Sequence, residues 1–183
     1  HYETGKLDLS ARYEFNTRVR LTNDTKSNNT GISQFDNKKV VAADIPAIAA
    51  LGGQYKLLPN LRVSAGYNYF FDKQAKEYNS ATDRNDKQDY IDGNTWEFLG
   101  GVEYDINDKL TVSTGANTTT YGFGDEKKYI SDMSFATNSV SVGIGCRYHI
   151  NSKMSVDIAA LNTFYSKLTK EMKDYDNVGA SYY

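Results

Sequence analysis

The sequence predicts an all-β protein, an antiparallel up-and-down transmembrane β-barrel of which residues 1–183 form a single segment. Three observations predict this fold class. Positions 6–21 alternate between apolar and polar residues, which is the period of a β-strand with one apolar face. The same alternation returns in later stretches of the chain. Short polar turns also alternate with long polar connections, an asymmetry that is typical of outer-membrane barrels.

The first predicted strand, 6–22, is notable for its length. Its apolar side carries residues such as Leu9 and Tyr13, and its polar side carries Arg12 and Glu14. At about 3.3 Å per residue this strand is roughly 50 Å long, whereas strands of globular proteins usually contain about five or six residues. A soluble β-sandwich alternates in the same way, so the pattern alone leaves that alternative open. The length favours a barrel wall that stands in a bilayer.

Further strands follow the same alternation along the chain. They are predicted at 43–57, 61–71, 94–106, 109–121, 134–150 and 153–165. An odd number of strands cannot return the chain to the side from which it started, so an eighth strand is needed. Residues 180–183 are interpreted as its beginning, and the natural polypeptide is expected to continue beyond them.

Three hairpins share one pattern, in which Tyr, any residue, an aliphatic residue and three turn residues are followed by an aliphatic residue, any residue and Val. They lie at 55–63, 104–112 and 148–156. Three-residue polar or proline-containing loops suit tight hairpins. The long connections lie at 23–40, 72–93, 122–133 and 166–179. The short turns are therefore predicted to be periplasmic and the long loops to lie outside the cell.

Aromatic residues gather near both ends of the predicted strands. The group near the short turns consists of Tyr55, Tyr104 and Tyr148, and the group near the long loops consists of Tyr67, Tyr69, Phe71, Trp96 and Phe98. Amphipathic aromatic rings favour the two interfaces of a membrane, so two aromatic belts are predicted. The alternative interpretation is ordinary strand propensity, because aromatic residues are common in strands of every kind.

The polar face of the strands cannot meet lipid, because an Arg or Lys at the bilayer midplane costs about 2–4 kcal/mol. The third hairpin places Arg147 opposite Asp157, which predicts a structural ion pair in the lumen. Glycines on this face either leave room for a ligand or plug, or relieve sheet curvature; they are Gly66, Gly101, Gly115, Gly143 and Gly145. Apolar residues on the same face are candidates for lining a hydrophobic ligand or for filling the barrel, namely Phe70, Leu99, Tyr121, Leu161 and Tyr165.

The composition excludes several other classes of protein. The net charge is −2, with 21 basic and 23 acidic residues, so there is no basic field for nucleic acid. Cys146 is the one cysteine, which excludes an internal disulfide. His1 and His149 have no Cys or His partner at metal-ligand spacing, so no metal ligand and no cofactor are predicted. No catalytic constellation is found, and the protein is predicted not to be an enzyme.

The stretch 45–55, with Pro46, Leu51, Gly52 and Tyr55, resembles a strand of the FadL/OMPP1/TodX outer-membrane transporters. The stretches 61–69 and 138–148 look like later strands of Bacteroidetes members of that family. The resemblance implies the C-terminal part of a larger barrel with an N-terminal plug. It also implies passive uptake of long-chain fatty acids or other hydrophobic molecules across the outer membrane of a Gram-negative bacterium, with a lateral opening as one route. The plug segment, further strands and the closing strand are expected to lie outside residues 1–183.

Two alternatives remain beside this interpretation. An eight-stranded barrel of the OmpA/OmpX kind would be structural or adhesive, since eight strands leave an interior that side chains just fill. A soluble sandwich or binding module would have to tolerate long strands and exposed tyrosine belts, which invite aggregation. For both barrel hypotheses the lipid bilayer is a partner, and for the transporter a hydrophobic small molecule is the ligand.

Overall fold

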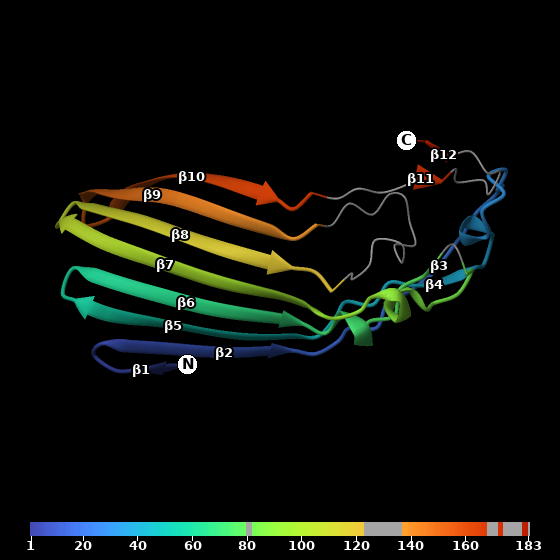
Figure 1. Cartoon of the computed structure of the whole chain (residues 1–183), viewed down its shortest axis with the longest axis horizontal. Helices are drawn as coiled ribbons and strands as arrows, with labels where there is room; N and C mark the ends of the chain where they lie inside the picture. The colour runs from blue at the N-terminus through green and yellow to red at the C-terminus, as the bar shows by residue number, and fades with distance from the viewer. Residues whose placement is uncertain (80–81, 123–136, 168–171, 174–180, 183) are drawn as a thin grey trace.

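The computed structural model describes residues 1–79, 82–122, 137–167, 172–173 and 181–182. Its main feature is one antiparallel sheet of eight strands in the order β1-β2-β5-β6-β7-β8-β9-β10 (Figure 1). Neighbours in this sheet are also neighbours along the chain, apart from the β3–β4 hairpin that is inserted between β2 and β5. The predicted all-β, antiparallel, up-and-down fold class is confirmed. In the described part of the chain the sheet is open, with β1 and β10 at its two edges.

The long strands form where the alternation predicted them. Their bounds are Ile48–Leu58 for β5, Leu61–Phe70 for β6, Thr95–Asn107 for β7, Leu110–Thr120 for β8, Ser139–Asn151 for β9 and Met154–Tyr165 for β10. The first residues of the strand predicted at 134–150 lie outside the described residues. Each of these strands except the edge strand β10 is paired along most of its length on both sides.

The first ribbon differs from the prediction because both of its strands are interrupted. The strand predicted at 6–22 is divided into β2, Leu7–Glu14, and β3, Arg20–Thr22, and β5 is preceded by a separate short strand, β4, Val40–Ala42. The alignment nevertheless continues across the gap, as the ladder partners show: Glu14↔Ile48, the isolated bridge Thr17↔Ile45, and Arg20↔Ala42.

The interruption has a local cause. Pro46 has no amide hydrogen with which to continue a ladder. In place of ladder bonds, the Asn16 side-chain amide donates to the Ile45 carbonyl at 2.8 Å, and the Val19 amide donates to the Asp44 carboxylate at 3.0 Å. The uninterrupted strands that alternation predicted are therefore wrong between residues 15 and 19 and between 43 and 47.

The eighth strand of the sheet is also not the predicted one. Ser181–Tyr182 forms β12 and pairs with Met172–Lys173, β11, in a separate two-stranded sheet, and residues 180 and 183 lie outside the described part. The additional strand of the main sheet is β1, Tyr2–Glu3, which pairs with β2. A backbone hydrogen bond of 2.7 Å from the Thr4 amide to the Leu7 carbonyl closes this hairpin.

All short turns lie at one end of the sheet, and the long connections lie at the other (Figure 1). Asparagine side chains stabilise two of these turns. Asn107 Oδ1 accepts hydrogen bonds from the amides of Lys109 and Leu110, and Asn151 Oδ1 accepts one from the amide of Lys153. These contacts explain the polar composition of the predicted three-residue turns.

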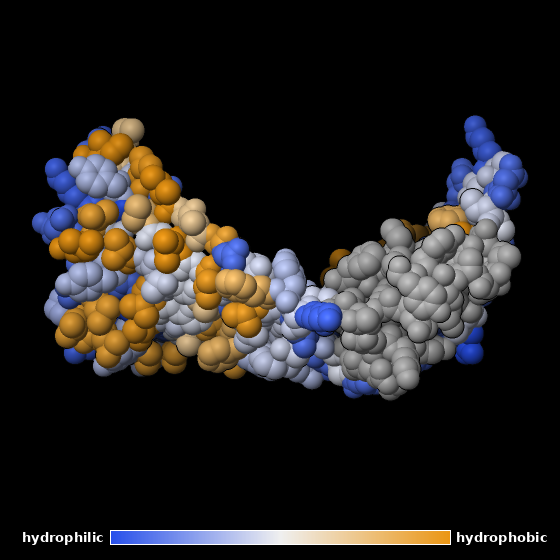
Figure 2. Space-filling view, turned by 45° about the horizontal axis from the view of Figure 1, so that its top comes forward, coloured by the Kyte–Doolittle hydropathy of each residue, from blue (hydrophilic) through white to orange (hydrophobic). Residues whose placement is uncertain are grey.

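The sheet buries little of its apolar face. Ile144 and Ile158 are each 67% exposed, and Figure 2 shows apolar side chains gathered over the strand region. The buried apolar side chains of the described residues lie instead in the long connections or at the strand ends beside them, namely Val41, Ala42, Ala47, Ala75 and Tyr78. Short 3-10 helices occur there, at Ser33–Phe35, Asp72–Gln74 and Lys87–Tyr90. In the part of the chain that the structure describes, no helix is long and apolar enough to span a membrane.

Candidate functional site

The polar face of the sheet is the candidate functional surface. Residues that are paired directly across an antiparallel ladder lie on the same face. Arg62 is paired with Glu103, Thr111 with Arg147, and Arg147 with Asp157, so one polar surface continues from β6 to β10. Because successive side chains of a strand point to opposite faces, the apolar residues lie on the other surface of the sheet.

An ionic cluster lies on this face near the short turns. The Arg62 guanidinium donates to Glu103 Oε1 from Nε at 2.6 Å, and it binds both carboxylate oxygens of Asp105 at 2.6 Å. Thr111 Oγ1 donates to Asp105 Oδ1 at 2.7 Å. A bidentate arrangement of this kind fixes geometry as well as charge. The cluster joins β6, β7 and β8 into one rigid layer.

The structure brings Arg147 and Asp157 together. Arg147 Nε donates to Asp157 Oδ1 at 2.7 Å, and the two residues are direct ladder partners on β9 and β10. Both side chains are about half exposed. Exposed ion pairs typically contribute about 0–1 kcal/mol to stability. The contact therefore supports the register of β9 and β10 rather than adding much to the free energy of folding.

A second polar layer lies nearer to the long connections. Glu97 on β7 accepts a hydrogen bond from the Asn68 side-chain amide at 3.0 Å and one from Thr119 Oγ1 at 3.1 Å. Thr119 is buried. The two polar layers leave a band of small residues between them on the same face.

This band forms a hollow of about 700 Å³. All of the predicted inward glycines line it, together with Leu99 and Leu161. Gly101 is paired with Gly115, and Gly115 with Gly143, so three adjacent strands present no side chain at that level. The volume lies within the usual range of about 300–1,000 Å³ for small-molecule sites. The hollow can therefore accept an apolar group between two polar layers.

The other candidate lining residues do not join this hollow. Phe70 lies at the end of β6 opposite Thr95, and Tyr165 lies at the end of β10, where it is exposed. Tyr121 follows β8, and its backbone amide donates a hydrogen bond to Asn138 Oδ1 at 2.8 Å. Of the five candidates, Leu99 and Leu161 line this hollow together, and the role of all five in binding a ligand stays a prediction.

Aromatic rings form a continuous belt on the apolar face near the long connections. Tyr67 and Tyr69 on β6 contact Trp96 and Phe71, with centroid distances of 6.5 Å for Tyr67–Trp96 and 5.0 Å for Tyr69–Phe71. Tyr13 on β2 extends the belt, with its ring centroid 6.2 Å from that of Phe71. The direct pairing Tyr67↔Phe98 adds a further ring position on the same face. This arrangement suits a membrane interface.

The described residues of the connections 15–47 and 71–94 pack together, and we call this region the cap. Asp83 Oδ1 accepts hydrogen bonds from Lys39 Nζ at 2.7 Å, from Ser33 Oγ at 2.7 Å and from the Tyr78 hydroxyl at 2.5 Å. Lys39 also lies over the Tyr78 ring, 5.7 Å from its centroid. These contacts join residues that are far apart in the chain, and no local pattern predicts them.

Asp44 is the second anchor of the cap. Its carboxylate accepts hydrogen bonds from the Arg20 guanidinium, from the Val19 amide and from the Lys76 amide. The hydrogen bond from Arg20 is the main reason why the pKa of Asp44 lies below its ordinary value. The hydrogen bond from Lys39 likewise lowers the pKa of Asp83, and burial raises the pKa of Tyr78. Both aspartates therefore favour the ionised form, in which they stabilise the cap.

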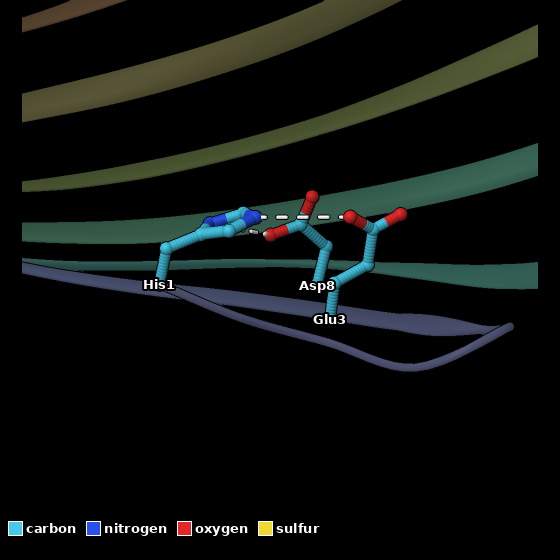
Figure 3. Close-up of side chains that lie close together, drawn as sticks. All are labelled: His1, Glu3 and Asp8. Carbon is cyan, nitrogen blue, oxygen red and sulfur yellow. Dashed lines mark ion pairs between the residues drawn. The ribbon is translucent and has the colours of Figure 1, made fainter.

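One group of metal-binding residue types is present in the described residues, and it was not predicted. His1, Glu3 and Asp8 lie together on the β1–β2 hairpin, and one ligand atom from each lies within 4.8 Å of the others (Figure 3). His1 has no Cys or His partner at metal-ligand spacing in the sequence, and its two neighbours here are carboxylates. Glu3 and Asp8 could have been found from the hairpin register, had the strand at residues 2–3 been predicted.

Comparison with known proteins identifies a similar fold. No family model matches the chain, and no curated protein matches it. Among solved structures, the chain is similar to the crystal structure of a Pseudomonas aeruginosa FadL homologue, with a TM-score of 0.69 and 16% sequence identity. The match covers 98% of this chain and 45% of that structure, so the chain spans less than half of its length. The resemblance to FadL-type proteins is confirmed at the level of the fold, and the Bacteroidetes assignment stays a prediction.

Proposed function

We propose that this chain is part of an outer-membrane β-barrel of a Gram-negative bacterium, and that the barrel takes up long-chain fatty acids or other hydrophobic small molecules by diffusion. The observation that carries the proposal is the FadL-like fold over 98% of the chain. The proposed barrel includes strands beyond this sheet and a plug. No enzymatic step and no cofactor are part of the proposal.

The exposed apolar face supports the membrane location. Large apolar side chains such as Leu51, Ile144 and Ile158 are more than 60% exposed on one face of the sheet. Soluble proteins rarely expose contiguous apolar patches of more than a few hundred Å². In a bilayer these side chains contact acyl chains, and the aromatic belt lies at the interface.

The hollow on the polar face supports the choice of ligand. Leu99 and Leu161 offer apolar contacts, and the glycines around Gly115 leave space for an acyl chain or a ring. The interrupted ladder at residues 15–19 and 43–47, where the cap joins β2 and β5, supports a side exit at the rim of the barrel, because fewer backbone hydrogen bonds join the two segments there. The eight-stranded structural barrel has no specific observation in its favour.

The test is uptake of a labelled long-chain fatty acid by bacterial cells that carry the full-length protein. Gly143→Phe is expected to reduce uptake several-fold. A Cβ atom at Gly143 meets Ala160 O and Leu161 Cδ1 at 3.5 Å, which is ordinary contact, so the ring enters the hollow without a backbone clash. The matched control is Gly100→Phe, where a Cβ atom meets only Ser64 O at 4.0 Å on the apolar face.

Equal uptake by the wild type, the Gly143→Phe variant and cells without the protein would refute the proposed function. The amount of folded protein in the outer membrane is measured for both variants. A reduction that is the same for Gly100→Phe and Gly143→Phe would contradict the role of the hollow.

A further inference from the structure

We propose that His1, Glu3 and Asp8 form a binding site for a divalent transition-metal ion of the zinc class. The site lies on the polar face of the sheet, at the edge formed by β1 and β2 (Figure 3). The proposal concerns metal binding alone and does not rest on the proposed transport function.

The hairpin register brings the three side chains together. Glu3 and Asp8 are direct ladder partners, so their side chains leave the sheet on the same face. His1 is two residues from Glu3 along the strand, and side chains two residues apart also share a face. No change of the backbone is therefore needed to direct three donors at one point.

One of the two donor distances, that between His1 and Asp8, already matches a coordination sphere. His1 Nδ1 lies 3.3 Å from Asp8 Oδ1, and His1 Nε2 lies 3.9 Å from Glu3 Oε2. Two ligand atoms of a tetrahedral zinc ion with bonds of about 2.0–2.2 Å lie roughly 3.3–3.5 Å apart. The carboxylates approach different nitrogens of the ring, so one of them has to rotate toward the nitrogen that binds. The relative exposure of the three side chains is 60%, 67% and 44%, which leaves them free to do so.

The donor chemistry selects the class of ion. An imidazole nitrogen suits zinc, copper, iron and nickel, whereas magnesium and calcium prefer sites of oxygen atoms alone. Two carboxylates balance the charge of a divalent ion. Three protein ligands leave a fourth position open for water or another donor. The simpler alternative is a protonated His1 that forms ion pairs with Glu3 and Asp8, which requires no metal.

The experiment uses the full-length protein in detergent, without a polyhistidine tag and after treatment with a chelator. Titration calorimetry with ZnCl₂ is expected to show one saturable site per chain, and MgCl₂ is expected to give at least about tenfold weaker binding. His1→Ala, Glu3→Gln and Asp8→Asn are each expected to weaken zinc binding by about tenfold or more. The matched control is His149→Ala, which removes the other histidine and is expected to leave zinc binding unchanged.

X-ray absorption of the zinc-loaded protein provides the second readout, with a first shell of nitrogen or oxygen atoms alone and the outer-shell scattering of one imidazole ring, which His1→Ala is expected to remove. Zinc binding that is equal in the wild type and in His1→Ala would be adventitious and would overturn the proposal. The absence of saturable zinc binding to the wild type would overturn it as well. Because binding is measured directly, failure of fatty-acid uptake leaves this result unaffected.

Discussion

Arg62 shows how a single residue organises the polar face. Its guanidinium binds Glu103 and Asp105, and Asp105 also accepts a hydrogen bond from Thr111 of the next strand. The Arg62 side chain is 19% exposed, so these hydrogen bonds are partly shielded from water. Removing the positive charge would leave two neighbouring carboxylates without their shared partner, which is costly in such a position.

At this scale we expect Arg62→Gln to lower the free energy of unfolding by about 1–3 kcal/mol, because charged hydrogen bonds of this kind are worth that much. Urea titration in detergent micelles measures the change. The matched control is Arg12→Gln, since Arg12 forms an exposed ion pair with Glu14 at 3.1 Å. That variant is expected to change the free energy by about 0.5 kcal/mol or less. Equal effects of the two substitutions would contradict the role assigned to Arg62.

The cap is the element whose stability depends on acid. The pKa of Asp83 is lowered chiefly by its hydrogen bond from Lys39, and the pKa of Asp44 chiefly by that from Arg20. A depressed pKa means that the carboxylate stabilises the folded cap above the ordinary aspartate value of about 3.9. This contribution is lost as the pH falls from there through the lower folded-state values. The cap is therefore expected to weaken below about pH 4.

Asp83→Asn is expected to weaken the cap at neutral pH and to flatten its response to acid. Asp83 has a φ of 55°, a conformation that asparagine tolerates well, so the substitution changes charge and leaves the backbone in place. Hydrogen exchange of the Tyr78 and Asp44 amides, corrected for the intrinsic effect of pH, measures the response. Asp24→Asn is the control, because Asp24 is almost fully exposed. An unchanged acid response in Asp83→Asn would refute the mechanism.

The elements also show how far the sequence leads. Alternation predicted the strands, their faces and the partners Arg147 and Asp157, because these follow from a two-residue period and from short turns. It did not predict the break around Pro46, since the bonds that replace the ladder come from Asn16 and Asp44. Alternation also could not predict that Leu99 lines the hollow whereas Tyr165 lies at the end of β10. The neighbours of a side chain at a strand end depend on how the loops are placed.

At the scale of the whole molecule, the sheet has two chemically different surfaces and two edges. β10 is paired only with β9 in the described residues, and beyond Tyr2–Glu3 the outer side of β2 is unpaired in the main sheet. Backbone groups without partners cost several kcal/mol each in a bilayer. In a membrane barrel both edges of this sheet have to be paired, either with each other or with further strands.

The two surfaces predict opposite responses to one added charge. Ile158 and Ala159 are neighbours on β10 and face opposite sides of the sheet. In the proposed membrane barrel, we expect Ile158→Arg to destabilise the protein by about 2–4 kcal/mol, the cost of an arginine at the midplane. Ala159→Arg is expected to have a smaller effect, because its side chain enters the polar interior. The free energy of unfolding in lipid vesicles measures both effects. A larger loss for Ala159→Arg than for Ile158→Arg would contradict the assignment of the lipid-facing surface.

In the proposed barrel, the packing of the cap has a consequence for proteases that act from outside the cell. A single cut between Thr25 and Ile32 would leave two fragments. The β3–β4 pairing, the contact of Asp44 with Arg20 and the β2–β5 pairing would still hold these fragments together. The nicked protein would therefore migrate as one species until it is denatured.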